Sequence, residues 1–241
     1  RIQSIEFNKD QYLNSIISIN KNVINEAKEK DKTKPESIFS LHGIPVLLKD
    51  NINYDGLATT AGTIALNDNV TNNAFIVDKL KNEGALILGK TNLSEWAYYF
   101  CNNCPSGYSA QGGQTLNPYG RKIFDSGGSS SGSGAAISAN FSSVSLGSET
   151  SGSILSPSSA NSIVGLKPTI GLVSRSGIVP ISSTLDTSGP MTKNVIDNAI
   201  VLKAISGYDQ NDNMSVNTDS IDLESIINSS LKGKRFGVFK D

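Results

Sequence analysis

The chain has 241 residues, of which 18% are charged and 37% hydrophobic, and its formal net charge is -1 at pH 7. This length suffices for one large domain or two small ones with a buried core. Because the charge is close to neutral, no basic surface for phosphates is expected, and nucleic acid is not favoured as a partner. No stretch reaches the roughly 18 apolar residues that a membrane-spanning helix needs, so no membrane partner is expected.

Scarce residue types exclude whole classes of chemistry. The chain has one histidine, His42, and two cysteines, Cys101 and Cys104. A Ser-His-Asp triad would have to use His42, and a histidine-rich metal site cannot be built from one imidazole. Serine, in contrast, occurs 35 times, with 23 of these between residues 101 and 200. We therefore expect proton transfer through hydroxyls and a lysine, with no metal and no cofactor.

The hydrophobic pattern predicts helices that alternate with short buried strands, which is typical of a layered α/β fold. Residues 11–30 carry apolar side chains at near-helical spacing, and residues 44–49 are a short apolar run that ends in a lysine. In chain order the remaining expected elements are a helix at 74–82, a strand at 85–89, a helix near 92–100, a helix at 135–141, a strand at 144–147, a helix that begins near Pro157 and an amphipathic helix at 194–206.

The C-terminal part contains two further features. The polar stretch 207–220 is expected to be an exposed connection, and residues 234–241 resemble the start of another strand. Because the sequence also begins at Arg1 without a methionine, we expect part of a longer protein that is truncated at both ends. In that case a missing signal peptide carries no information about location, and the cytoplasm is the favoured compartment.

Residues 126–134 form a block of serine and glycine that allows three interpretations. A flexible linker is the usual one for this composition. A phosphate-binding loop is disfavoured because no lysine occurs between Lys122 and Lys167, and because Ile137 replaces the third glycine of the dinucleotide pattern. Since an apolar segment follows at once, we favour a loop that leads into a helix.

A second cluster of small residues lies at 147–157, where a strand is expected to end and a helix to begin. A strand, turn and helix in this order can present a hydroxyl beside several converging backbone N–H groups. Backbone groups arranged in this way can form an oxyanion hole.

Seven motifs in order along the chain resemble those of the amidase signature family of serine amidohydrolases. The motifs are His42–Asn51, Gly89–Trp96, Gly127–Gly132, Gly147–Ile154, Val164–Thr169, Gly171–Gly177 and Asp186–Pro190. The similarity extends from residue 41 to about 209. Residues 90–96, 112–115 and 172–178 resemble the bacterial peptide amidases, which hydrolyse C-terminal carboxamides of peptides, more than the glutaminase subunit of tRNA-dependent amidotransferases.

The resemblance implies the fold and the domain organisation of that family. We expect an α/β fold in which a mixed central β-sheet is flanked by helices. Family members are much longer, so residues 1–241 are expected to be the N-terminal catalytic part of a single amidase domain whose C-terminal part is absent. An incomplete sheet would expose an edge and apolar surface, which favours self-association of the fragment.

The resemblance also implies a triad of a lysine, a serine that follows a cis peptide bond and a nucleophilic serine. By motif these residues are Lys49, Ser129 and Ser153. Burial beside an apolar run would lower the pKa of the lysine, so that the neutral amine draws a proton from Ser129 while Ser129 draws one from Ser153. The oxyanion hole would consist of the backbone N–H groups of Thr150, Ser151, Gly152 and Ser153.

Three other groups of residues are interpreted without a catalytic role. His42 is expected to shape a turn. Cys101 and Cys104 have the spacing of a redox motif but lack its strand–helix context, so incidental free thiols are expected. The aromatic residues between Trp96 and Phe100 are expected in the core or in a pocket wall, with substrate binding as the alternative.

Three residues depart from the family pattern without removing a catalytic atom. Ser126 replaces a proline that is common before the double glycine, and Leu155 replaces the arginine that follows the nucleophile motif in many relatives. Ser151 stands where the amidotransferases have glycine and the peptide amidases typically have aspartate.

Three functions remain open at this point. The first is hydrolysis of a peptide C-terminal amide or a small carboxamide through a serine acyl-enzyme, with release of ammonia. The second is the glutaminase subunit of a tRNA-dependent amidotransferase. The third, of another class, is a non-catalytic binding fragment. For the first, the expected partner is a small-molecule or peptide amide substrate.

Overall fold

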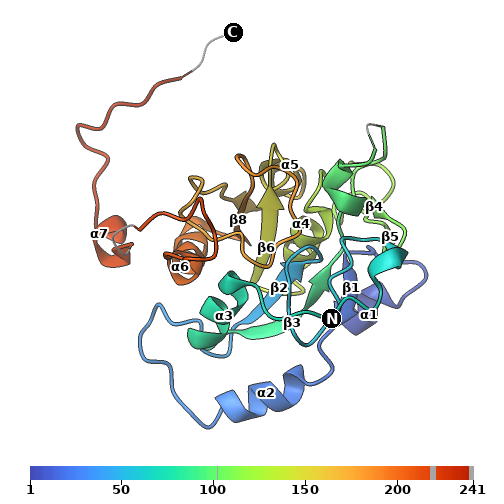
Figure 1. Ribbon diagram of the computed structural model, residues 1–241, viewed down its shortest axis with the longest axis horizontal. Helices are drawn as coiled ribbons and strands as arrows, with labels where there is room; N and C mark the ends of the chain where they lie inside the picture. The colour runs from blue at the N-terminus through green and yellow to red at the C-terminus, as the bar shows by residue number, and fades with distance from the viewer. Residues whose placement is uncertain (102, 218–220, 239–241) are drawn as a thin grey trace.

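The computed structural model describes residues 1–101, 103–217 and 221–238. Its centre is a mixed β-sheet of six strands in the order β1-β3-β2-β6-β8-β7, flanked by helices (Figure 1). The strands of this sheet are β1 (Ile16–Ile19), β2 (Pro45–Lys49), β3 (Leu86–Thr91), β6 (Val144–Glu149), β7 (Val164–Gly165) and β8 (Thr187–Thr192). A separate ribbon pairs β4 (Tyr108–Ser109) with β5 (Gly113–Gln114). The expected fold class is thereby confirmed.

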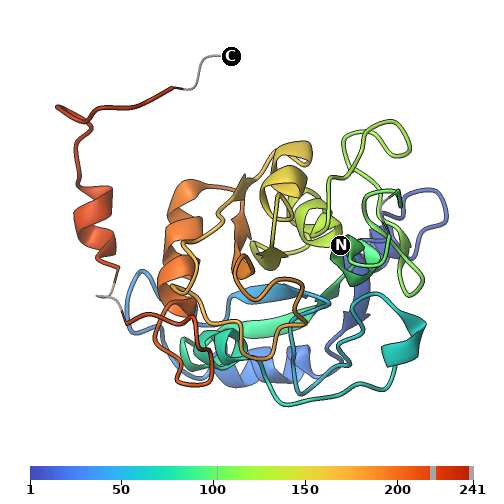
Figure 2. The ribbon, with the colours of Figure 1, turned by 45° about the horizontal axis from the view of Figure 1, so that its top comes forward.

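Helices lie on both faces of the sheet. The α-helices are α1 (Ile2–Glu6), α2 (Val23–Lys30), α3 (Phe75–Asn82), α4 (Ser131–Ser138), α5 (Leu155–Ala160), α6 (Val195–Ile205) and α7 (Leu223–Ile227). Two short 3-10 helices are η1 (Ile64–Leu66) and η2 (Glu95–Tyr98). The core against α3 and α6 is separate from the core against α4. In both views α7 and the described residues after it lie beside the body of the molecule (Figures 1 and 2).

The last residue of strand β2, Lys49, lies on the face of the sheet that packs against helix α4. Val46 and Leu48 belong to the core that contains α3 and α6, whereas Leu47 packs with Ala136 of α4. Because side chains alternate between the two faces of a strand, Lys49 is on the same face as Leu47. The alternation of the apolar run thus places the terminal lysine next to the N-terminus of α4.

Three parallel strands end at one edge of the sheet. β2 pairs in parallel with both β3 and β6, so Lys49, Thr91 and Glu149 end at the same edge. β8 is antiparallel to β6 and begins there, with Thr187 opposite Glu149. In open α/β sheets the region beyond the carboxyl ends of parallel strands is the usual place for a ligand site.

The expected helices at 74–82 and 194–206 and the expected strands at 85–89 and 144–147 are confirmed by α3, α6, β3 and β6. The helix expected near Pro157 is also confirmed, as α5. The helix expected at 135–141 begins earlier, at Ser131. The serine-glycine block is therefore partly helical, which excludes the flexible-linker interpretation.

The single helix expected over residues 11–30 is wrong in its first half. Residues 16–19 form β1, which pairs with β3 in antiparallel fashion, and α2 begins only after Asn22. The three isoleucines of β1 are β-branched and suit a strand as well as a helix. Pairing with a distant strand decides between the two, and spacing within the sequence does not report it.

The helix expected near 92–100 is also wrong. Only the 3-10 helix η2 forms, and Trp96, Ala97 and Tyr98 have positive φ angles of 50°, 51° and 72°. The backbone of the preceding Ser94 donates a hydrogen bond to the Ser129 carbonyl at 3.0 Å. Contact with a distant loop thus accompanies the departure from helical geometry.

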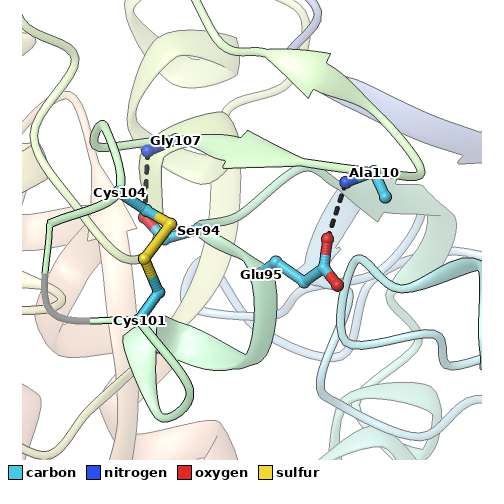
Figure 3. Close-up of a disulfide and its surroundings, with 6 residues drawn as sticks. All are labelled: Ser94, Glu95, Cys101, Cys104, Gly107 and Ala110. Atoms are coloured by element: carbon cyan, nitrogen blue, oxygen red, sulfur yellow. Dashed lines mark hydrogen bonds between the residues drawn. A yellow bond between two sulfur atoms is a disulfide. The ribbon is translucent and has the colours of Figure 1, made fainter.

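Cys101 and Cys104 form a disulfide, so the expectation of free thiols is wrong (Figure 3). Cys101 ends a turn in which its amide donates to the Tyr98 carbonyl at 3.0 Å. The segment is anchored on either side, since the Ser94 hydroxyl accepts from the Gly107 amide at 2.9 Å and Glu95 accepts from the Ala110 amide at 2.7 Å.

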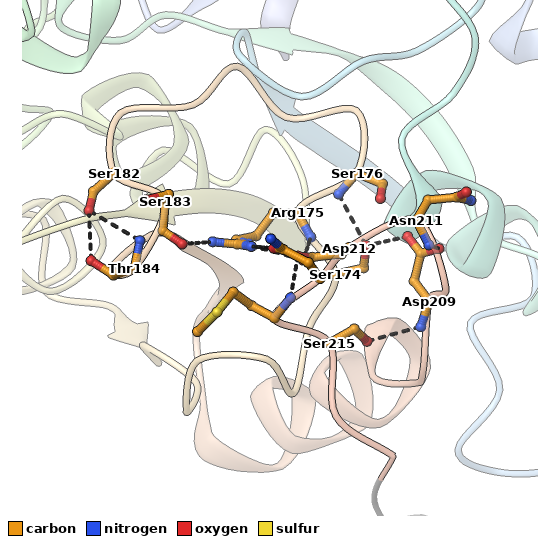
Figure 4. Close-up of polar contacts among 12 residues, drawn as sticks. Ser174, Arg175, Ser176, Ser182, Ser183, Thr184, Asp209, Asn211, Asp212 and Ser215 are labelled. Atoms are coloured by element: carbon orange, nitrogen blue, oxygen red, sulfur yellow. Dashed lines mark hydrogen bonds and ion pairs between the residues drawn. The ribbon is translucent and has the colours of Figure 1, made fainter.

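The stretch 207–220 is not simply an exposed connection. Asp209 and Asp212 are 3% and 7% exposed. The Arg175 guanidinium donates to Asp212 and, at 2.5 Å, to the Ser183 carbonyl, while Ser174 donates to Asp209 at 2.6 Å (Figure 4). The side chains of Asp209 and Asp212 thus fasten the segment that contains Ser174 and Arg175, and Arg175 in turn holds the Ser183 carbonyl. Residues 218–220 lie outside the described part.

The strand expected at 234–241 does not form over residues 234–238, and residues 239–241 lie outside the described part. Among the described helices, none is both long and apolar enough to cross a membrane.

Candidate active site

The Lys49 amine lies in a buried cage of oxygen atoms at the sheet edge. Lys49 is fully buried, and its Nζ lies 2.7 Å from the Ser129 hydroxyl, 2.9 Å from the Ser148 hydroxyl and 3.2 Å from the Ser148 carbonyl. The Asn51 amide donates to the same Ser148 hydroxyl at 2.8 Å. A carbonyl can only accept, so Lys49 uses one N–H there and can direct its lone pair to a hydroxyl when it is neutral.

Burial lowers the pKa of Lys49 from its ordinary value of 10.5 to about 7, against the opposing negative charges of Asp186 and Glu149. The direction expected from the apolar run before Lys49 is therefore confirmed. A group with a pKa near the working pH is well matched to general acid–base catalysis.

Ser129 lies two residues before helix α4, directly after two glycines. The peptide bond between Gly128 and Ser129 is cis, as the resemblance implies. Gly127 has φ +66°, and a β-carbon there would collide with the backbone of Pro157 at 2.6 Å. Only glycine fits this position, because any side chain would meet both the positive φ and the collision.

Ser153 lies in the turn between β6 and α5 and is 7% exposed. The Ser153 carbonyl accepts a hydrogen bond from the Ser130 amide at 3.0 Å, which joins this turn to the one that carries Ser129. Gly152 just before it has φ +78°, a region that favours glycine. Among the bonds of the described residues, no direct hydrogen bond joins the Ser129 and Ser153 hydroxyls.

The backbone amides around Ser153 are available to a ligand. Within the described part of the chain, the amides of Ser151, Gly152 and Ser153 donate no hydrogen bond to a protein acceptor. The next two amides, those of Ile154 and Leu155, donate to the buried Glu149 carboxylate at 2.7 and 3.0 Å. Thr150 is held by its side chain, which donates to Asp186 at 2.5 Å.

Sequence reasoning missed four residues of this region: Asn51, Ser148, Glu149 and Asp186. All four lie inside motifs that the sequence does contain. The contacts of Asn51, Ser148 and Asp186, however, join different motifs and depend on the register of β2 with β6 and of β6 with β8, which no spacing within a single motif reveals. Glu149 differs, because it accepts from the Ile154 amide of its own motif.

Comparison with known proteins gives consistent matches. The family model described as amidase matches residues 3–241. A probable amidase of Arabidopsis thaliana is 44% identical over 94% of this chain and 46% of its own length. The peptide amidase of Stenotrophomonas maltophilia, a solved structure, superposes with a TM-score of 0.86 at 46% identity, over 92% of this chain and 46% of its own.

A third relative is named for a different activity. This relative, a glutamyl-tRNA(Gln) amidotransferase subunit of Thermoanaerobacter pseudethanolicus, is 42% identical over 95% of this chain and 46% of its own length. The chain thus spans about half the length of each of these three relatives.

Proposed function

The chain belongs to the amidase signature family, and on this basis we propose that it hydrolyses a carboxamide C–N bond through a serine acyl-enzyme and releases ammonia. The observation that carries the proposal is the contact of 2.7 Å between the buried Lys49 amine and the Ser129 hydroxyl. A lysine whose pKa is lowered to about 7 is neutral in a large fraction of molecules at neutral pH and can accept a proton.

In the proposed reaction Ser153 is the nucleophile and Ser129 relays protons between Ser153 and Lys49. Ser153 attacks the amide carbon while its proton passes to Ser129 and the proton of Ser129 passes to Lys49. The oxyanion is held by amides of the segment Thr150–Ser153. The N–H groups of Ser151, Gly152 and Ser153, which have no acceptor among the described residues, support this role. The leaving ammonia takes a proton from Ser129, and water repeats the sequence on the acyl-enzyme.

The substrate class we propose is a peptide C-terminal amide or a small carboxamide. Support comes from the similarity to the Stenotrophomonas peptide amidase at 46% identity. The second candidate is the glutaminase reaction of an amidotransferase, which is favoured by the 42% identity to the Thermoanaerobacter amidotransferase protein. Glutamine turnover that depends on added partner proteins distinguishes this second candidate from the first.

We also propose that residues 1–241 are the N-terminal catalytic part of a single, longer amidase domain, with apolar surface that favours self-association when the remainder is missing. Coverage of only 46% of the relatives' lengths supports this. A cytoplasmic location remains a prediction, and the Cys101–Cys104 disulfide is of a kind that persists chiefly in oxidising compartments.

The test is ammonia release from a panel of peptide amides, short aliphatic amides and glutamine. We expect turnover of at least one carboxamide by the unmodified protein and none above background by Ser153→Ala. Release of ammonia that survives this substitution would refute the proposed mechanism, and absence of turnover for the whole panel would favour a non-catalytic binding role.

A further inference from the structure

Lys167 reaches the turn that carries Ser153 from a different part of the chain. It lies in the loop after β7, and its Nζ donates to the Thr150 carbonyl at 2.9 Å. The same Nζ lies 3.8 Å from Glu149 Oε1, an ion pair whose carboxylate is almost fully buried. The lysine thus holds the first residue of the turn and the acid that precedes it.

The contact with the Thr150 carbonyl fixes the direction of the next amide. The peptide bond between Thr150 and Ser151 is trans, since the described backbone has a cis bond only between Gly128 and Ser129. In a trans peptide the C=O and the N–H of one plane point in opposite directions. With the Thr150 carbonyl turned toward Lys167, the Ser151 N–H therefore faces away from Lys167.

Two of the later peptide planes of the turn are fixed in the same manner. The Gly152 carbonyl accepts from the Ser156 amide at 2.7 Å, and the Ser153 carbonyl accepts from the Ser130 amide at 3.0 Å. Both bonds join two backbone groups, so they depend on the fold and not on a particular side chain. The Thr150 plane is different because a side chain, partly exposed at 27%, holds its carbonyl.

From these contacts we infer that Lys167 is a positioning residue that acts through the Thr150 carbonyl to present the Ser151 amide to the oxyanion. This inference rests on the proposed function and goes beyond it, because it assigns the orientation of one donor to a side chain outside the triad. Without the lysine, the Thr150 carbonyl loses its bond and the orientation of the Thr150–Ser151 plane is less fixed, so the oxyanion loses a preorganised donor.

The test compares Lys167→Met and Lys167→Arg with Lys193→Met as the matched control. Lys193 also donates to a backbone carbonyl, that of Ser138 at 3.0 Å, so its replacement removes a bond of the same kind outside the triad and the Ser153 turn. For each variant kcat, KM and the inhibition constant of a peptide aldehyde are measured. The aldehyde forms a tetrahedral adduct with Ser153 whose oxygen occupies the oxyanion site.

We expect Lys167→Met to lower kcat by about 10- to 100-fold, which is somewhat less than the effect of losing one oxyanion donor completely. The aldehyde should bind more weakly by a similar factor. KM should change much less than kcat, since the donor acts on the transition state. Lys167→Arg should recover part of the loss because its guanidinium can donate to the same carbonyl, and Lys193→Met should behave like the unmodified protein.

Unchanged kcat in Lys167→Met would overturn the inference, as would a loss of equal size in Lys193→Met or a loss confined to KM. The rate at which a fluorophosphonate labels Ser153, followed by mass spectrometry, gives a readout that needs no amide substrate. If the unmodified protein hydrolyses no amide, the proposed function fails while this labelling rate still tests the role of Lys167. A labelling rate unaffected by Lys167→Met would then refute that role.

Discussion

Two lysines among the described residues, Lys49 and Lys90, are completely buried near the ends of neighbouring strands. They differ in the groups that surround the amine. Lys90, near the end of β3, lies beside Leu48 of β2 in the sheet. Its Nζ lies 3.6 Å from Asp50 and donates to the Ile52 carbonyl at 2.5 Å and to the Thr59 hydroxyl at 2.9 Å. Lys49 has no carboxylate within ion-pair distance among the described residues, and hydroxyls form most of its cage.

This contrast explains how one fold gives two equally buried lysines different roles. Burial lowers the pKa of Lys90 to about 8, while the adjacent Asp50 opposes the shift. Burial lowers the pKa of Lys49 to about 7, where the opposing carboxylates, Asp186 and Glu149, are more remote. A lysine with a paired carboxylate suits a structural clamp, whereas a lysine among hydroxyls suits proton transfer.

The largest expected effect concerns the lysine among hydroxyls. Lys49→Met should lower kcat/KM for an amide by about 1000-fold or more, as loss of a member of a nucleophile–base unit does. Its free energy of unfolding should change little, because methionine removes an amine that is costly to bury but leaves the Ser129 and Ser148 oxygens with one donor fewer. Steady-state kinetics and urea unfolding of the same preparation measure both. Retained activity, or a large loss of stability, would contradict this assignment.

For the paired lysine the expected effect is on stability. Lys90→Met leaves the Asp50 carboxylate buried without its partner, which should lower the free energy of unfolding by about 3–5 kcal/mol. Adding Asp50→Asn removes the charge and keeps an acceptor for Thr60 and Gly62, so the double variant should recover part of the loss. Urea unfolding of the unmodified protein and the two variants measures these changes. An unchanged free energy of unfolding in Lys90→Met would show that the Lys90–Asp50 pair does not stabilise the fold.

A smaller effect is expected on pH dependence. Only neutral Lys49 accepts a proton, so kcat/KM should rise with pH around a midpoint of about 7. Asp186 raises the pKa of Lys49, so Asp186→Asn should lower that pKa and move the midpoint of the profile to lower pH. The exposed Asp10→Asn is the control. A shift to higher pH would refute the sign of this coupling.

The smallest effect is expected for the disulfide, which has neither the catalytic role of Lys49 nor the structural role of Lys90. Because the ring closed by Cys101 and Cys104 is short, replacing both with serine should lower the free energy of unfolding by at most about 2 kcal/mol. Alkylation before and after reduction, followed by mass measurement, tests the bond itself. Two alkyl groups added without a reductant would mean that the cysteines are free thiols.

Motifs predicted much of this site because they name residue types whose chemistry is fixed, as for Lys49, Ser129 and Ser153. The contact between Ser148 and Asn51 was not predicted, because 97 residues separate them in the sequence and only the strand register brings them together. The strand at 16–19 was not predicted for a similar reason, since its pairing with β3 outweighs a helical spacing of isoleucines. Information on pairing between distant segments is the part that a single sequence lacks.

The proposed mechanism depends above all on the charge state of Lys49, which NMR can measure. In protein labelled with carbon-13 at the lysine ε position, the Lys49 signal is identified by its absence from Lys49→Met and followed through a pH titration. We predict a midpoint of about 7 for Lys49. A midpoint near the ordinary lysine value of 10.5 would contradict the mechanism, because the amine would then be protonated at neutral pH and unable to accept the proton of Ser129.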